Sequence, residues 1–163
     1  MFRSARPART VVAASVLTGT LLLAACSPTI TTKAYAPSDG ARVDLTNQVR
    51  GLNLMVVSEG DGQPGAVLGA LANDSAEDVD FVLTAEGAEP ISLNVPAGQT
   101  VYLSADQEGD RVVDAQFGAV DTHPGGDLDA TLSGAGVEED FSLPVMDGTL
   151  PEYAAWVPNT SAS

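Results

Sequence analysis

The chain has 163 residues, with 22 acidic residues against 7 lysines and arginines, 16 glycines, 10 prolines and a single cysteine. This length suits one modest domain and excludes a chain of several domains. The formal charge of −15 disfavours nucleic-acid binding, because phosphate contacts supply most of that affinity and the few basic residues beyond position 10 are scattered.

The N-terminus has the pattern of an export signal. Three arginines within residues 1–10 precede an apolar stretch at residues 11–25, and no acidic residue does. The stretch closes with Leu23-Ala24-Ala25-Cys26. Here the chain resembles bacterial lipoproteins, whose lipobox has this Leu-Ala-Ala-Cys pattern. The resemblance implies that residues 1–25 are a signal peptide removed from the mature protein and that Cys26 is lipidated.

The resemblance also implies a location, the extracytoplasmic face of the cell membrane. The apolar stretch is shorter than the roughly 20 residues of a membrane-spanning helix, which disfavours the alternative of a transmembrane anchor. Two or more acyl chains would hold the protein stably on the membrane. With Cys26 acylated, no thiol remains for a disulfide or a nucleophile.

The mature chain, residues 26–163, is strongly acidic. Its 22 acids stand against Lys33, Arg42, Arg50 and Arg111 only, which gives a formal charge of −18. We interpret this charge as a solvated, self-repelling surface that keeps an exported domain soluble. Attraction of cations or basic partners is the alternative.

Residues 26–41 are rich in threonine, serine and proline and have no apolar periodicity, so we expect the acylated cysteine to be followed by a flexible tether. Residues 42–146 instead alternate apolar and polar residues between turns of Gly, Pro, Asn and Asp. This pattern predicts an all-β domain, an antiparallel β-sandwich of immunoglobulin-like or cupredoxin-like kind. The expected strands cover residues 43–45, 52–57, 66–72, 79–84, 91–95, 100–103, 111–117, 128–132 and 137–143.

Two hairpins are expected within this set. One joins residues 66–72 to 79–84 through a polar turn, and the clearer one joins 91–95 to 100–103 through Pro96-Ala97-Gly98-Gln99. The residues expected to point into the core are Leu52, Leu54, Val56, Leu71, Phe81, Leu83, Ile91, Leu93, Val95, Val101, Leu103, Phe117, Leu128, Leu132 and Phe141.

The tail, residues 147–163, carries Tyr153 and Trp156 between two prolines. We expect the tail to pack on or beside the domain, because so much aromatic area is costly to leave in water. The alternative is that these aromatic residues form an exposed recognition element. In that case Tyr102, Tyr153 and Trp156 would make up a partner-binding patch.

No catalytic constellation is found. The chain has one histidine, His123, in a Pro-Gly-Gly turn, and it has no Gly-x-Ser-x-Gly elbow and no phosphate-binding loop. Two acidic loops, residues 59–63 and 106–110, suggest a calcium site. Both fail as EF-hand loops because Pro64 and Arg111 stand where glycine is required. A looser calcium site between loops stays possible, and we do not expect an enzyme.

A second resemblance concerns the domain. Residues 50–145, with Val-Pro-Ala-Gly between two strands, are similar in layout to LpqE-like actinobacterial lipoproteins and to exported copper chaperones of the PCuAC type. The chaperones bind copper(I) through two histidines and two methionines, which suit this soft ion. Here only His123, Met55 and Met146 are available, and their spacing does not reproduce the family motif.

The sequence therefore predicts a lipid-anchored envelope protein that acts as a non-catalytic binding or structural module. Copper carriage is the alternative, and it requires His123 to approach Met55 or Met146. The expected partners are the membrane, through the lipid anchor, and an envelope protein or ligand that the sequence does not identify.

Overall fold

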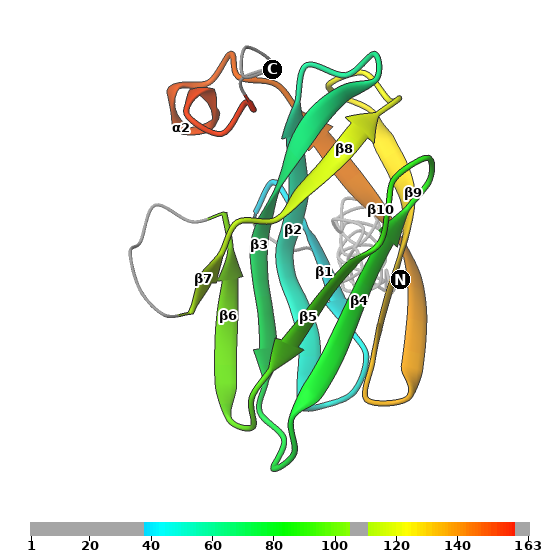
Figure 1. Cartoon of the computed structure of the whole chain (residues 1–163), viewed down its shortest axis with the longest axis vertical. Helices are drawn as coiled ribbons and strands as arrows, with labels where there is room; N and C mark the ends of the chain where they lie inside the picture. Colours follow the sequence, from blue (N-terminus) through cyan, green and yellow to red (C-terminus); the bar gives the residue numbers. More distant parts are fainter. Residues whose placement is uncertain (1–37, 105–110, 159–163) are drawn as a thin grey trace, which may run out of the picture. The chain divides into compact units, whose positions relative to one another are not determined.

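The computed structural model describes residues 38–104 and 111–158, which form ten strands and one short helix (Figure 1). The prediction of an all-β fold is confirmed. The elements are β1 (Ala41–Asp44), β2 (Val49–Ser58), β3 (Gln63–Asn73), β4 (Val79–Ala85), β5 (Ile91–Val95), β6 (Gln99–Leu103), β7 (Val112–Val113), β8 (Gln116–Val120), β9 (Asp127–Gly134), β10 (Val137–Met146) and α2 (Pro151–Ala154).

The strands form one mixed sheet in the order β5-β4-β9-β10-β2-β3-β6-β7, with β1 beside β2 and β8 beside β3. Strand β10 joins its two halves: most of β10 pairs antiparallel with β9, and its last two residues, Val145 and Met146, pair parallel with β2. A second parallel pair joins β6 and β7. The arrangement is sandwich-like, but it is not purely antiparallel as predicted.

The core lies between the two halves of the sheet. Its largest fully buried side chains come from both: Leu54 and Phe117 from one half, and Phe81, Leu132 and Leu143 from the other. Most residues predicted to point inward are buried there, and the half-buried Ile91, Leu93 and Phe141 pack against them. Leu52 is the exception: it is outside this core and lines a hollow on the surface.

Neither predicted hairpin exists. Strand β3 pairs with β2 and β6, whereas β4 pairs with β5 and β9, so the segment between β3 and β4 crosses from one half of the sheet to the other. The segment between β5 and β6 crosses back in the same way. Alternation had located most of the strands, but it carries no information about which strand pairs with which.

The buried side chain of Asn73 holds these two crossings together. Its Nδ2 donates hydrogen bonds to the carbonyl oxygens of Glu77 at 2.8 Å and Val95 at 3.0 Å. Its Oδ1 accepts from the backbone N–H of Ser75 at 3.0 Å. The backbone N–H of Gly98 also donates to the Ser75 carbonyl, which ties the second crossing to the first. The polar turn is thus a structural clamp with its hydrogen-bonding capacity used.

Strand β2 contains a β-bulge that reverses its alternation. Leu52 pairs with Ala70 and Met55 pairs with Leu68, so two residues of β2 lie opposite the single residue Gly69 of β3. One of these two, Asn53, has a φ of 51°, a conformation that asparagine tolerates better than most residues. The prediction that Leu52 points inward is therefore wrong.

Two further strand predictions need correction. The single strand expected at residues 111–117 is divided into β7 and β8, because the first part pairs with β6 and the second with β3. Strand β3 begins at Gln63, ahead of the expected residue 66. It passes through Pro64, which lies where the pairing with β8 is irregular and which, lacking an N–H, can give no ladder hydrogen bond.

The domain begins slightly before the predicted boundary. Gly40 donates its backbone N–H to the Asn53 side chain at 2.8 Å, and β1 starts at Ala41, so residues 38–41 belong to the domain. Residues 1–37, which include the predicted signal peptide and most of the tether, lie outside the described part of the chain. No helix within the described part is long and apolar enough to cross a membrane.

The bulge makes a prediction for Gly69, whose φ is 128°. A Cβ added there would lie 2.7 Å from the carbonyl oxygens of both Leu52 and Asn53. We expect Gly69→Ala to lower the free energy of unfolding by at least about 2 kcal/mol in urea denaturation. Gly118→Ala is the control, because a Cβ at this position meets no atom within 4 Å. Equal losses in the two variants would contradict the close approach at the bulge.

Candidate functional site

The outer face of the sheet carries an apolar patch that the bulge creates. Leu52 and Met55 both face outward on β2. Residues three positions apart in a regular strand point to opposite faces, but the extra residue of the bulge places these two side chains on the same face. Leu68 and Ala70 lie beside them on β3, and Tyr102 lies beside Ala70 on β6. Three adjacent strands thus present apolar and aromatic side chains away from the main core.

The C-terminal tail covers part of this patch. Helix α2 begins at Pro151, a position where the missing N–H of proline is not needed, and places Tyr153 against the sheet. Gly148 lets the chain fold back, since a Cβ there would lie 2.6 Å from a methyl group of Val157. The resulting second apolar cluster comprises Met55, Val57 and Tyr153, with Leu68, Met146, Trp156 and Val157 packed against them.

The part of the patch that the tail leaves open is a groove of about 530 Å³, which we call the aromatic groove. Apolar side chains and three aromatic rings make up most of its wall. The residues that define it are Leu52, Met55, Leu68, Ala70, Tyr102, Tyr153 and Trp156, with Asn53 and Glu152 also lining it. Tyr102 is 38% exposed, and Trp156 is half-buried. The structure thus brings together the three residues of the predicted partner-binding patch, from β6 and from the tail.

Tyr153 fixes the tail to the start of the domain. Its hydroxyl donates a hydrogen bond of 2.5 Å to the carboxylate of Asp39. This hydrogen bond, together with burial of the ring, raises the pKa of Tyr153 to about 12. Tyr153 is therefore a support for the groove more than an exposed contact, because its side chain is only 7% exposed.

Trp156 also lines a second hollow, of about 370 Å³. We call it the side hollow; Ser104, Asp114, Gln116 and Trp156 are among the residues that line it. The hydroxyl of Ser104 bonds to both the N–H and the carbonyl of Ala115 at 3.2 Å, which fixes the end of β6. Asp114 and Gln116 keep exposed polar side chains. Ser104 and Trp156 thus line both hollows.

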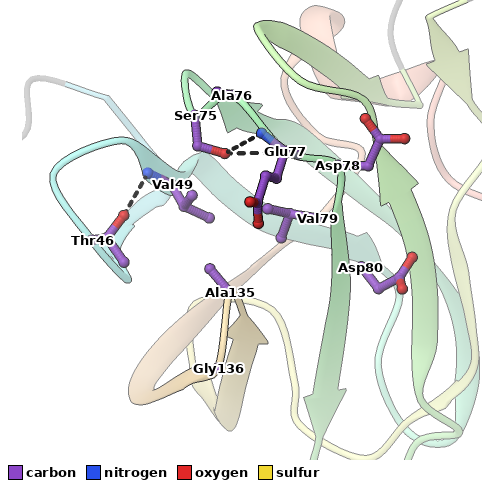
Figure 2. A pocket seen from close by; sticks show the side chains of 10 residues that line it. All are labelled: Thr46, Val49, Ser75, Ala76, Glu77, Asp78, Val79, Asp80, Ala135 and Gly136. Atoms are coloured by element: carbon purple, nitrogen blue, oxygen red, sulfur yellow. Dashed lines mark hydrogen bonds between the residues drawn. The ribbon is translucent and has the colours of Figure 1, made fainter.

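A third hollow, of about 660 Å³, lies where the loops after β1, β3 and β9 meet (Figure 2). Its floor includes Val49 and Val79, and the Glu77 side chain reaches into it (Figure 2). The hydroxyls at its edge serve local turns: Thr46 accepts from the N–H of Val49, and Ser75 donates to the carbonyl of Glu77. These contacts explain the loop structure, and the hollow includes none of the site residues that the sequence predicted.

The candidate metal ligands have different environments. Met55 is 3% exposed, and Met146 packs against the same second apolar cluster, so both sulfurs lie among aliphatic and aromatic side chains. His123 has an exposed side chain on the turn between β8 and β9. Copper binding by these residues stays a prediction.

The calcium prediction also stays open. The loop at residues 59–63 connects β2 to β3, and most of the second acidic loop lies outside the described residues, which omit 105–110. Within residues 38–104 and 111–158, no three His, Cys, Asp or Glu side chains are grouped closely enough to hold a metal ion. Cys26 lies outside the described residues as well.

No protein-family model and no curated protein matches the chain.

Sequence reasoning missed the floor of the aromatic groove. It assigned Leu52 to the core and gave Leu68 and Glu152 no role, although all three line the groove. The available signal was Gly69, a glycine inside an apolar strand, which often marks a bulge. Recognition of that bulge would have predicted the reversal in β2.

The hydrogen bond between Tyr153 and Asp39 predicts a pH-dependent stability. We expect Tyr153→Phe to lower the free energy of unfolding by about 1–3 kcal/mol near neutral pH. The folded-state pKa of about 12 lies above the ordinary value of 10.0, so folding favours the neutral phenol. This stabilisation is complete below about pH 10 and is lost as the pH rises from about 10 to 12.

Urea denaturation of the wild type and the variant across this range measures the difference between them, which should shrink as the pH rises. Tyr102→Phe is the control, because its ring lies on the open side of the groove. A difference between wild type and Tyr153→Phe that is constant with pH would contradict the assigned hydrogen bond.

Proposed function

We propose that the protein is an exported lipoprotein, held by lipid on Cys26 at the extracytoplasmic face of the cell membrane. Its domain binds a partner through the aromatic groove and performs no catalysis. The anchor is supported by the arginines, the apolar stretch and the lipobox of residues 1–26. The acidic mature chain is compatible with an exported soluble domain.

The observation that carries the binding role is the convergence of Tyr102 and Trp156 on one apolar-floored groove. These rings come from β6 and from the tail, 54 positions apart in the sequence, and both line the groove together with Leu68 and Ala70. Aromatic residues that border an open apolar hollow are typical of protein interfaces, where such rings supply much of the binding energy. The groove is formed by the bulge in β2 and by the tail that packs against the sheet, so it does not depend on a single exposed side chain.

The chemistry of the groove favours contact over reaction. Two of the hydroxyl groups that line it are engaged in structural hydrogen bonds, Ser104 with Ala115 and Tyr153 with Asp39, and the third belongs to the exposed Tyr102. The carboxylate of Glu152 lies at the exposed rim, on the first turn of α2. This arrangement suits recognition of a partner by shape and charge, and we therefore propose a binding module.

The lipid anchor is tested with Cys26→Ser. We expect this variant to move from the membrane fraction to the soluble fraction and to lose partitioning into the detergent phase, because the acylated thiol is absent. Ser27→Ala, which keeps the cysteine, should stay with the membrane. Membrane association of the Cys26→Ser variant equal to that of the wild type would contradict lipid anchoring at this residue.

The groove is tested by photo-crosslinking in intact cells. We replace Tyr102 with p-benzoylphenylalanine, an aromatic residue that reacts with groups in contact with it, and look for a discrete higher-mass adduct of the protein. The control places the same residue at Ser92, which is exposed on β5. A discrete adduct from position 102 and none from position 92 is expected. Identical patterns from the two positions would remove the case for the groove.

A further inference from the structure

We propose that the aromatic groove takes a cationic peptide segment, an extended stretch with one apolar anchor residue flanked by lysine or arginine. This inference rests on the proposed binding function and specifies the chemistry of the partner. The floor of the groove, the aromatic rings at its edge and the carboxylates near it favour such a segment.

The floor of the groove suits one aliphatic side chain. Leu52, Leu68 and Ala70 form an apolar surface on adjacent strands. The volume of the groove, about 530 Å³, exceeds that of any single side chain, so there is room for an aliphatic side chain to enter it. Leu52 and Leu68 are only half-buried, so apolar area is still exposed to water in the free protein. Covering that area with an apolar anchor is favourable, at about 25 cal/mol for each Å² removed from water.

The edge of the groove suits cations. Tyr102 and Trp156 offer aromatic faces, over which the ammonium of lysine or the guanidinium of arginine is attracted. The aliphatic stems of these side chains can lie along the same apolar floor while their charged groups stay in water. An anchor with basic neighbours therefore uses both parts of the groove.

The carboxylates that line the two hollows have the complementary sign. The exposed carboxylate of Glu152 lines the aromatic groove, and that of Asp114 lines the side hollow. Of the three arginines in the described residues, Arg42 and Arg50 are paired with Asp44 and Asp74. Arg111, whose backbone carbonyl accepts a hydrogen bond from the N–H of Tyr102, is exposed and is the one described cation beside the groove. With a formal charge of −18 on residues 26–163, the long-range field also attracts a basic segment.

The two hollows favour a segment over a compact ligand. Trp156 lines both, so a chain that passes over its ring reaches the groove of about 530 Å³ and the side hollow of about 370 Å³. Each hollow then offers an acidic group, Glu152 in one and Asp114 in the other. An extended peptide can satisfy both, whereas a single small cation occupies only one.

The test uses the fluorescence of Trp156, the only tryptophan in the chain, which lines both hollows. The full-length lipidated protein is reconstituted in phosphatidylcholine vesicles and titrated with tryptophan-free peptides, and empty vesicles serve as the blank. The first peptide has a central leucine flanked by lysines in a glycine-serine background. The second replaces the lysines with glutamates, and the third replaces the leucine with glycine.

We expect saturable quenching or a spectral shift with the first peptide only. Removal of the leucine should weaken binding roughly tenfold or more, since a buried aliphatic anchor is lost. Reversal of the charges should weaken it by at least about tenfold, and added salt should weaken binding of the lysine peptide. Glu152→Gln should reduce its affinity by about two- to fivefold, as expected for one exposed charge.

Glu138→Gln is the matched control, because Glu138 is exposed on the part of β10 that pairs with β9. It should leave the affinity unchanged within about 1.5-fold. Equal binding of the lysine and glutamate peptides would overturn the inference, and so would a response to soluble cell-wall saccharides but to none of the peptides. An adduct at position 102 without peptide binding would overturn only the partner chemistry. Failure of both experiments would overturn the proposed function as well.

Discussion

The pairing of two residues of β2, Asn53 and Leu54, with the single residue Gly69 of β3 determines what the outer face of the sheet presents. A strand without this bulge would alternate regularly, and Leu52 would point to the same side as Leu54. With the bulge, Leu52 and Met55 both face outward. The backbone tolerates it because Gly69 admits a close approach and because Gly40 donates a hydrogen bond to the Asn53 side chain. The groove depends on this local mismatch.

The tail turns that apolar face into a bounded groove. Without it, Met55 and Val57 would be exposed; with it, both are buried beneath Tyr153. The hydrogen bond from Tyr153 to Asp39 connects the C-terminal helix to the point where the chain enters the domain. The two ends of the described domain therefore meet at the same place and stabilise each other, and Trp156 is held where it lines two hollows.

The acidic composition and the apolar groove favour the same kind of partner. Burial of the apolar floor supplies affinity but does not discriminate between apolar partners. The exposed carboxylates of Glu152 and Asp114 add a preference for partners with positive charge. Because the groove is built from strands and a packed tail, its shape exists before a partner arrives. Preorganisation of this kind reduces the entropy that binding would otherwise cost.

The sequence by itself determined that the domain is all-β and which segments are strands, because period-two alternation is a local property of the chain. It also favoured a tail that packs on the domain, because large aromatic rings are costly to leave in water, and it offered a patch of Tyr102, Tyr153 and Trp156 as the alternative. Only the tertiary structure decided that the expected hairpins are crossings, that β10 joins the two halves of the sheet, and that Leu52 faces outward. These features depend on hydrogen bonds between segments far apart in the chain, and alternation within one strand contains no information about its neighbours.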